Sequence, residues 1–403
     1  MKRYIYILAS LCFMMGCLKE EKIDATVQLS LTFAAEFAQI DKTAIEVLLK
    51  SPTTGVSYKS NCNAEGLVTF HVEYGFYEAS FQYKYASEGI MTIFNGRAEN
   101  ILITPGKEVT IPFPMEIVAA RSSQIIIKEH YFYGVKTSTG SNYTYDAYLS
   151  LYNNSDEIAY LDSLCIGIVT PMASSGGNNF IVDGVLADTL ALDQMAWTFL
   201  DPDGGSAKNI YPLLPGEECV IAYCAINHEA THADAVDMSK AHFAFYQMDM
   251  AGTGGVTQPT VGVNPLKLMW RNTPTTRSFP ITTQPRAFVL FRIQGTSPEE
   301  YGSNIKNISK SLTNPTASTN YLRVPNEWVL DGMEGVNSST AANKRLAAMV
   351  DAGFCYIDGG ATGCGKSLIR KVQEVIDGRV VYEDTNNSTH DFETAEVATW
   401  KNK

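Results

Sequence analysis

From residue 26 onward, apolar and polar residues alternate strictly, and this alternation limits the possible fold more than any other feature of the chain. In residues 26–33 every second side chain is apolar, beginning with Val27 and Leu29. Side chains of a strand point alternately to the two faces of a sheet, so a period of two predicts a half-buried strand. Similar short runs recur at hairpin spacing up to residue 113, between turns rich in Gly, Asn and Pro. Residues 26–118 are therefore predicted to form one antiparallel β-sandwich.

A second β-rich unit is predicted from residue 119 to residue 403. Runs rich in Ile, Val and Tyr occur at 122–135, 141–169 and 287–293, and β-branched and aromatic residues favour strands. The composition agrees, because 21 Tyr and 18 Phe accompany a charged fraction of only 18%. We expect an all-β protein of two immunoglobulin-like antiparallel β-sandwich domains with few short helices. The one helix candidate beyond the N-terminal segment is 337–349.

Three long insertions interrupt the second unit, at 171–183, 201–207 and 251–263. Gly, Thr, Pro and Asn are frequent in them. Long loops in a compact domain are usually functional or disordered, so the surface that they share is a predicted binding surface. Plain decoration of the fold is the alternative.

The N-terminal segment predicts export and lipid attachment. Lys2 and Arg3 form a basic start, residues 4–15 are apolar but too few to span a bilayer, and Gly16 precedes Cys17. These residues resemble a bacterial lipoprotein signal at 1–16, which is cleaved before the cysteine that receives diacylglycerol. The resemblance implies that Cys17 carries lipid, and two or more acyl chains anchor a protein durably. Residues 17–25 would be the lipidated tether.

A short charged stretch follows the predicted lipid-acceptor cysteine. Lys19, Glu20 and Glu21 resemble the Bacteroidetes export pattern that sends lipoproteins to the outer face of the outer membrane. The resemblance implies a lipid-anchored protein of the outer membrane that faces the cell exterior. A polar tether of accidental charge is the alternative.

Three short stretches of the first unit resemble a known module. They are TTGVSY at 53–58, NAEGLVTF at 63–70 and GFY at 75–77, and they resemble the transthyretin-like repeat of carboxypeptidase regulatory domains. In that family the module is a spacer or stabiliser and not the catalytic part.

The second unit resembles a wider family. The runs at 145–164, 215–228, 236–243 and 384–392 resemble lamin-tail-like domains, which are immunoglobulin-type sandwiches. Together with other runs of the chain, they resemble an uncharacterised family of Bacteroidales surface lipoproteins, domain of unknown function 4876, over residues 26–395. This resemblance implies a fold and a location, and no activity that can be assigned to a residue.

One motif has the spacing of a zinc protease. His228, Glu229 and His232 spell H-E-x-x-H, which on a helix places two imidazoles on the metal and a glutamate beside its water. Here the motif directly follows an apolar run that predicts a strand, and no helical periodicity supports it. We therefore expect a loop with ordinary solvated side chains and no metal.

A second motif has the spacing of a phosphate-binding loop. Residues 360–367, GATGCGKS, match G-x-x-x-x-G-K-S. A nucleotide fold needs further parallel strands after the loop, and few residues follow. We expect instead a β-hairpin with 359–365 at its tip, and no nucleotide. Nucleic acid is disfavoured too, because the formal net charge is -12.

Six cysteines remain if Cys12 leaves with the signal and Cys17 takes lipid. Cys355 and Cys364 flank a glycine-rich turn, and in an oxidising compartment they could pair across a hairpin. Free thiols buried as small hydrophobic side chains are the alternative.

No arrangement of nucleophile, base and acid is legible in the sequence. We expect a non-catalytic cell-surface lipoprotein without a cofactor, which binds an extracellular ligand or a partner such as the barrel of an outer-membrane importer. An adhesive or surface-matrix component is the alternative. A zinc hydrolase that uses His228, Glu229 and His232 is the third hypothesis.

Overall fold

The computed structural model describes residues 24–33, 37, 40–87, 90–104, 109–113, 123–182, 185–199, 209–340 and 344–403. The chain divides into two compact units, 1–81 with 98–114 and 82–97 with 115–403. The expected boundary between residues 118 and 119 lies outside the described residues, as does the predicted signal at 1–16.

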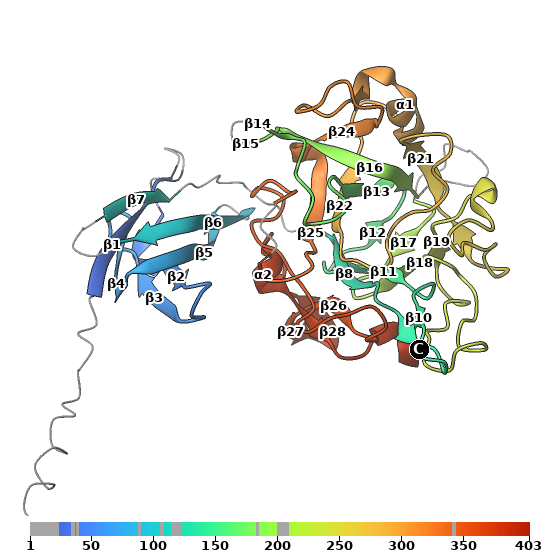
Figure 1. The fold of residues 1–403 in the computed structure, drawn as a ribbon, viewed down its shortest axis with the longest axis horizontal. Coiled ribbons are helices and arrows are strands. Elements are labelled where there is room, and N and C mark those ends of the chain that lie inside the picture. Colours follow the sequence, from blue (N-terminus) through green and yellow to red (C-terminus); the bar gives the residue numbers. More distant parts are fainter. Residues whose placement is uncertain are drawn as a thin grey trace, which may run out of the picture. The chain divides into compact units, whose positions relative to one another are not determined.

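Strands of the first unit form two sheets (Figure 1). The first sheet consists, in spatial order, of β4 (Leu67–Glu73), β1 (Asp24–Leu31) and β7 (Val109–Phe113). The second consists of β3 (Ser57–Asn61), β2 (Glu46–Lys50), β5 (Gly75–Ser87) and β6 (Ile90–Ile103), and the residues of β5 and β6 within 82–97 are counted with the second unit. Strand β1 pairs with β4 in antiparallel and with β7 in parallel orientation.

In β1, the apolar residues of the alternating sequence pattern are the buried ones, and the polar residues are partly exposed. Val27 and Leu29 are fully buried, whereas the alternate side chains, Thr26, Gln28 and Ser30, are partly exposed. The strand begins at Asp24, so residues 24 and 25 belong to the sheet and the predicted tether ends earlier than residue 25. Strand β3 was not expected, because its sequence SYKSN contains no apolar alternation and none of its residues is buried.

The second unit contains two larger sheets. The first consists, in spatial order, of β20 (Asn264–Pro265), β19 (Phe243–Ala244), β18 (Glu218–Ala222), β11 (Tyr148–Asn153), β8 (Ile125–Tyr131), β26 (Ser367–Arg370) and β29 (Phe392–Ala395). The second consists of β23 (Ile308–Ser309), β24 (Tyr321–Pro325), β16 (Thr189–Thr198), β13 (Leu164–Val169), β22 (Ala287–Arg292) and β25 (Val329–Glu334), and β21 (Lys267–Arg271) also pairs with β16.

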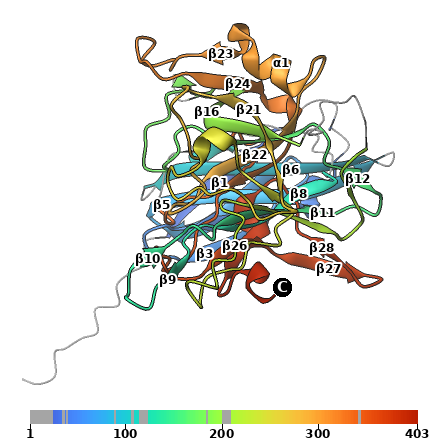
Figure 2. The same ribbon diagram turned by 90° about the vertical axis from the view of Figure 1, so that its right-hand side faces the viewer.

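Four two-stranded ribbons and two short helices complete the second unit. The ribbons are β9 (Val135–Lys136) with β10 (Asn142–Tyr143), β12 (Ala159–Tyr160) with β17 (Pro212–Leu213), β14 (Ile181–Val182) with β15 (Val185–Leu186), and β27 (Val372–Ile376) with β28 (Arg379–Tyr382). The helices are α1 (Pro298–Ser303) and α2 (Ser388–Asp391). Figure 2 shows the β27–β28 ribbon projecting from the edge of this unit.

The main core lies between the two large sheets. Leu149 of β11, Trp197 of β16 and Leu290 of β22 belong to one buried cluster, to which strands of both sheets contribute. The intervening residues of β22, such as Val289, belong to a second cluster on the other face of their sheet. Strand β22 is therefore buried on both faces, which explains its continuous apolar run. The predicted all-β sandwich architecture is confirmed.

The predicted helix at 337–349 is not formed in the described part of that range, 337–340 and 344–349, which consists of turns and irregular backbone. The amides of Arg345 and Leu346 donate hydrogen bonds to the buried carboxylate of Glu334, over 3.1 and 2.9 Å. A carboxylate from a neighbouring strand thus takes the donors that a helix would bond to its own carbonyls.

Helix α1 was not expected, although its sequence carries a start signal. Ser297 and Glu300 form a capping box, in which each side chain meets the backbone amide of the other, and Pro298 occupies the first turn. Among the described residues, no helix is long and apolar enough to cross a membrane.

Candidate functional site

The second unit has an open groove beside the β27–β28 ribbon, which we call the ribbon groove. Its volume is about 580 Å³, and its lining includes Lys128, Tyr152, Glu218, Arg379, Tyr382 and Lys403. Strands β8, β11 and β18 supply the floor, and β28 supplies one wall.

Strand register places the charged side chains on one face of the floor. Tyr152 and Glu218 lie directly opposite each other on β11 and β18, and directly opposite residues of an antiparallel pair share a face. Strand β8 has a register shift at this point, where Ser150 faces Glu129 but Leu151 faces Ile127. The residue between, Lys128, is therefore the extra residue of a β-bulge, which re-aims its side chain toward the groove.

Two lysines hold the carboxylate of Glu218. The ammonium of Lys128 lies 3.0 Å from Oε1, and the ammonium of Lys403 pairs with Oε2. Burial acts to raise the pKa of Glu218, but the charge of Lys128 and the hydrogen bond from Lys403 outweigh it and hold this pKa below its ordinary value. The floor thus carries an ionised carboxylate between two cations.

Ring contacts fix the β28 wall to the floor. The rings of Tyr152 and Tyr382 meet edge to face with centroids 4.8 Å apart, and the Tyr152 hydroxyl donates to the carbonyl of Val380 over 2.7 Å. Lys128 lies 6.0 and 5.8 Å from the two ring centroids, within the range of a cation–π contact. Burial raises the pKa of Tyr382 to about 12 and also raises the pKa of Tyr152, so the hydroxyls of both tyrosines stay protonated.

The side chain of Asn154 extends the pairing of β28. Its Nδ2 donates to the carbonyl of Tyr382 over 3.0 Å, and its Oδ1 accepts from the Tyr382 amide over 2.8 Å. The Asn154 carbonyl accepts from Nη1 of Arg379 over 2.9 Å. The inner strand of the ribbon is thus bonded to the body of the unit, whereas all five residues of β27 are exposed.

Tight turns shape the rim. Asp377 and Gly378 have positive φ angles of 50° and 83° and connect the paired residues Ile376 and Arg379, as an Asp-Gly hairpin turn does. Opposite, a Cβ on Gly216 would lie 2.9 Å from Cγ of Arg379, so a larger residue would push that side chain away. Two exposed apolar residues, Leu214 and Ile376, are the sequence neighbours of the lining residues Pro215 and Asp377.

A second cavity, of about 380 Å³, lies beside the GATGCGKS loop and is lined by Gly363, Cys364 and Gly365 among others. The amide of Gly363 donates to the Tyr133 carbonyl over 2.6 Å, and the amide of Gly365 donates to the Gly134 carbonyl over 2.8 Å. Two amides that a phosphate-binding loop would present to its ligand are thus bonded within the chain.

The prediction of a hairpin with 359–365 at its tip is wrong, because the segments before and after this loop do not pair with each other. Strand β26 follows this loop, as expected, but it pairs with β8 and β29 and not with the residues before the loop. The preceding segment instead forms an isolated parallel bridge between Cys355 and Gly335. Long-range pairing in the large sheet therefore overrides the local hairpin.

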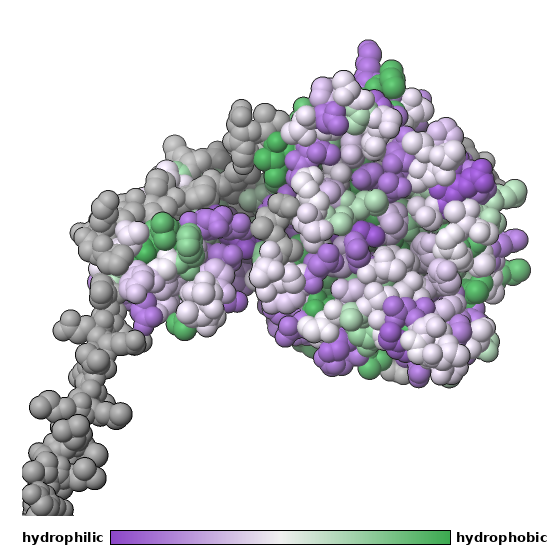
Figure 3. All heavy atoms as spheres, viewed as in Figure 1, coloured by the Kyte–Doolittle hydropathy of each residue, from purple (hydrophilic) through white to green (hydrophobic). Residues whose placement is uncertain are grey.

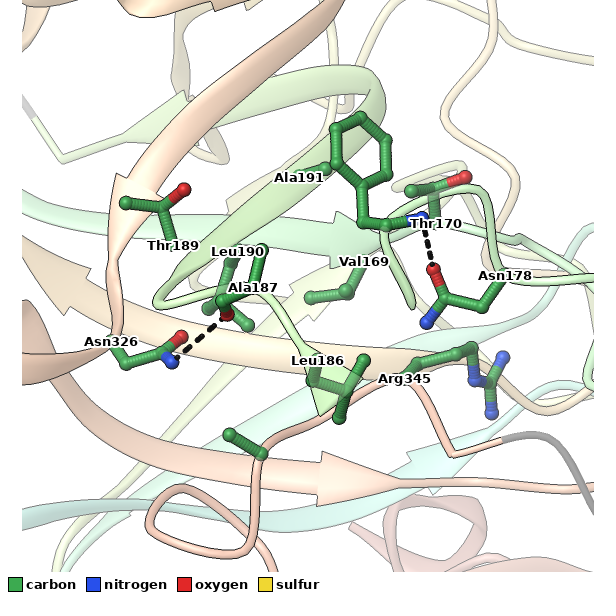
Figure 4. Close-up of a pocket in the computed structure, with 12 residues that line it drawn as sticks. Val169, Thr170, Asn178, Leu186, Ala187, Thr189, Leu190, Ala191, Asn326 and Arg345 are labelled. Atoms are coloured by element: carbon green, nitrogen blue, oxygen red, sulfur yellow. Dashed lines mark hydrogen bonds between the residues drawn. The ribbon is translucent and has the colours of Figure 1, made fainter. Parts of the chain in front are cut away.

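A third pocket, beside β16, is much smaller (Figure 4). Its volume is about 10 Å³, which is about the room that one water molecule needs. Asn326 lines it and donates from Nδ2 to the carbonyl of Ala187 over 3.5 Å, while its buried Oδ1 has no hydrogen-bond partner among the residues that the structure describes. This pocket has no room for an organic ligand.

The H-E-x-x-H motif lies in a turn after β18, as expected, but the expectation of solvated side chains is wrong for His228, which is buried. The Nε2 of His228 bonds the Cys224 carbonyl over 2.8 Å, so Nδ1 accepts from the Tyr143 hydroxyl at 2.7 Å. Burial lowers the pKa of His228, which favours this neutral ring. Glu229 points elsewhere and pairs with Lys401 at 3.1 Å. Within the described ranges, no group of three or more His, Cys, Asp or Glu residues could hold a metal ion.

The disulfide that Cys355 and Cys364 could have formed across a hairpin is not present, and both are free thiols. All six cysteines of the described residues are free, and five of them are buried. Cys355 lies in the main core, whereas Cys364 packs at its margin in the glycine-rich loop. Because this loop is not a hairpin tip, the two cysteines do not face each other across paired strands. The alternative of buried free thiols holds for Cys355.

The described residues of the first and third insertions do not line the ribbon groove. Phe180, in the first insertion, packs edge to face on Tyr321 of β24, 5.1 Å between centroids. In the third insertion, the carbonyl of Gly254 accepts from the Tyr223 hydroxyl next to β18, over 2.8 Å. The insertion at 201–207 lies outside the described residues, as do Cys17, Lys19, Glu20 and Glu21.

A buried charge cluster lies under the C-terminal segment. The guanidinium of Arg370 lies 2.6 Å from Asp331, 3.1 Å from Asp391 and 3.4 Å from Asp384. The Asp391 carboxylate also accepts the amide of Thr385 over 2.9 Å. The run at 384–392, which carried part of the family resemblance, thus folds around one arginine and holds α2 against β25 and β26.

Sequence reasoning did not single out the residues of the ribbon groove. Lys128, Glu218 and Arg379 lie far apart in the chain and belong to no motif. The bulge that aims Lys128 follows from strand register and leaves no local signal. The Asp-Gly pair at 377–378 is the one recognisable sign of the ribbon.

Comparison with known proteins finds one family model that matches part of the chain. Residues 214–399 are similar to the family model described as a protein of unknown function (DUF4876). The predicted resemblance to that family is confirmed for these residues. A search of curated proteins finds no match.

A solved structure shares the fold over most of the chain. It is the crystal structure of a DUF4876 family protein from Bacteroides thetaiotaomicron, 24% identical, with a TM-score of 0.58. The similarity covers 92% of this chain and 94% of that chain. The transthyretin-like, immunoglobulin-like and lamin-tail-like resemblances stay predictions.

Proposed function

We propose that this chain is a cell-surface lipoprotein, anchored in the outer membrane through lipid on Cys17, and that it binds a ligand or a partner without catalysis. The binding site is the ribbon groove. The anchor rests on the N-terminal sequence, in which a basic start and a short apolar run precede Gly16 and Cys17.

The single observation that carries the binding role is the groove itself. Its volume of about 580 Å³ falls within the range of sites that hold organic ligands or peptide segments. Arg379 and Lys403 offer cationic donors, and Leu214 and Ile376 offer apolar contacts beside them. Such a mixture suits recognition of a polar chain that also carries apolar groups.

The state of Glu218 supports binding in preference to catalysis. A general acid or base needs a pKa near the working pH. Glu218 pairs with Lys128 and Lys403, and these two cations lower its pKa. This carboxylate is suited to hold the floor of the groove together.

The partner is proposed to be an importer of the outer membrane, for which the chain would be an accessory binding protein. The apolar rim favours a macromolecular partner over a small polar solute, because exposed apolar side chains gain most when a large surface covers them. Adhesion to an extracellular matrix is the alternative. The zinc hydrolase is disfavoured, because both ring nitrogens of His228 are engaged within the chain.

Site-specific photo-cross-linking in intact cells tests this proposal. The cross-linker p-benzoylphenylalanine replaces Leu214 or Ile376 at the rim, and Met248 as a control, because Met248 is 84% exposed but does not line the groove. We expect discrete adducts from both rim positions and none from Met248. An importer in the adduct supports the accessory role, and a matrix component supports adhesion. Equal adducts from all three positions, or none from the rim, would contradict binding in the groove.

A further inference from the structure

In the described part of the first unit, four large hydrophobic side chains are exposed: Val56, Tyr74, Phe76 and Leu102. Their exposed fractions are 47%, 58%, 53% and 52%. On the face drawn in Figure 3, hydrophobic residues reach the surface of this unit as separate green patches. Single exposed apolar residues are common, but a set gathered at one place indicates an interaction surface.

Strand register places two of these residues beside the start of β1. Asp24, the first residue of β1, faces Glu73, the last residue of β4. The turn at Tyr74 and the start of β5 with Phe76 follow directly. Both aromatic side chains therefore lie at the end of the unit where β1 begins, which we call the β1 end.

The other two residues lie at the same end. Strand β2 runs antiparallel to β5, and its last residue, Lys50, faces Glu78 near the start of β5. The turn after β2, which contains Val56, is therefore at the β1 end. Strand β6 lies next to β5 and follows it after a two-residue connection, so it returns in the opposite direction. Leu102, its second-last residue, thus comes back to the β1 end.

The predicted lipid on Cys17 would lie close to these apolar side chains. Cys17 precedes Asp24 by seven positions, which a fully extended chain spans in at most about 25 Å. With lipid on Cys17, the β1 end is the part of the unit that the chain reaches first from the bilayer. The opposite end, where β3 turns into β4, lies at the other end of the strands.

We infer that the β1 end rests on the lipid bilayer, with Tyr74 and Phe76 in the interfacial region, and that it forms a second attachment beside the lipid on Cys17. Tyrosine suits this position because its amphipathic ring sits at the level of the lipid headgroups, and the apolar ring of phenylalanine can bury at the boundary with the acyl chains. Such a contact would fix the orientation of the first unit on the membrane. This inference rests on the lipoprotein anchor of the proposed function.

The charges near the β1 end specify the kind of lipid surface. Lys50 is exposed at this end, and Glu73 and Glu78 are partly exposed there. The mixture of signs gives no basic cluster that would attract anionic lipids. Attachment is therefore expected on neutral phosphatidylcholine, without enhancement by anionic phosphatidylglycerol.

Fluorescence quenching by brominated lipids tests the contact. The full mature lipoprotein is inserted into phosphatidylcholine vesicles whose acyl chains carry bromine, which quenches only tryptophans at the membrane. The variant Phe76→Trp reports on the β1 end, and Glu65→Trp, in the exposed turn between β3 and β4, is the matched control. The native protein corrects for its four tryptophans. We expect loss of emission for Phe76→Trp and none for Glu65→Trp.

Further variants and one mass measurement separate failure of the anchor from failure of the bilayer contact. Tyr74→Trp is a second reporter if Phe76→Trp does not fold, and adding Tyr74→Ser and Leu102→Ser to Phe76→Trp should abolish the quenching. If mass spectrometry finds no lipid on Cys17, the anchor itself is wrong. If the lipid is present and neither reporter is quenched, the anchor stands and the bilayer contact is overturned. Quenching replaced by concentration-dependent dimers would also overturn it, in favour of a second copy of the chain.

Discussion

Arg345 and Glu334 form a buried ion pair, in which Nε of Arg345 lies 2.8 Å from Oε1 of Glu334 and neither side chain is exposed. The same carboxylate accepts the amides of Arg345 and Leu346 and lies 3.1 Å from the ammonium of Lys344. One side chain at the end of β25 thus fixes the segment that follows residue 343.

Removing the arginine should destabilise the second unit strongly. In Arg345→Ala, Glu334 keeps Lys344 but loses its closest cation inside the core. Breaking a buried pair from one side costs about 3–5 kcal/mol of the free energy of unfolding, and Lys344 places the expected loss toward the lower figure. Urea denaturation measures this loss, and Arg277→Ala at an exposed position is the control. Equal midpoints for the two variants would show that the pair contributes little.

The aspartate cluster around Arg370 should make stability depend on pH. Burial raises the pKa of Asp384 to about 7. The folded chain therefore binds a proton that the unfolded chain has released, and the contribution of Asp384 to stability falls as the pH rises from about 4, its unfolded value, to about 7. Asp384→Asn should remove this part of the dependence.

The comparison is made by urea denaturation of the native chain and of Asp384→Asn at several pH values. We expect the stability of the native chain, relative to the variant, to decrease between about pH 4 and pH 7. An increase over that interval would mean that Arg370 dominates and that Asp384 is ionised throughout. Glu65→Gln, in an exposed turn, is the control and should leave the pH profile unchanged.

The cysteines should titrate as thiols. All six described cysteines are free, so the mature chain, unfolded without reductant, should react with six equivalents of a thiol reagent if Cys17 is blocked by lipid. In the folded chain, we expect Cys364 to react first, because it is the one that is partly exposed, whereas burial raises the pKa of Cys355 well above its ordinary value. Only four equivalents after unfolding would show that two of the cysteines form a disulfide, contrary to the structure.

The H-E-x-x-H motif should not hold zinc. His228→Ala is expected to lower stability, because it leaves the Tyr143 hydroxyl without its acceptor, but to leave the metal content unchanged. Metal analysis of the purified chain and of the variant makes this comparison. One zinc per native chain, lost in the variant, would show that the turn rearranges into a metal site.

Local patterns predicted the strands, and tertiary contacts decided the rest. The alternation in β1 and the continuous apolar run of β22 reflect burial on one face and on two faces, so both could be recognised in the sequence. Strand β3 has no such pattern because none of its side chains enters the core. The segment 337–349 has helical spacing, but the buried Glu334 takes its amides.

The candidate site could not be predicted because its residues converge only through the fold. A β-bulge turns Lys128 toward Glu218, and the C-terminal residue Lys403 completes the cluster. The two motifs with recognisable spacing, at His228 and at 360–367, place their donors in bonds within the chain. Motif spacing alone therefore pointed to two turns whose donors form hydrogen bonds within the chain and not with a ligand.

The most direct test of binding in the ribbon groove is the yield of the photo-adduct at the position of Ile376 when the charge of Arg379 is reversed. Arg379→Glu places an anion beside the rim, and Arg277→Glu makes the same change at an exposed position outside the groove lining. We expect the yield in intact cells to fall roughly tenfold in Arg379→Glu, as loss of one charged contact would cause, and to stay unchanged in Arg277→Glu. Equal yields in the two variants would contradict recognition in this groove.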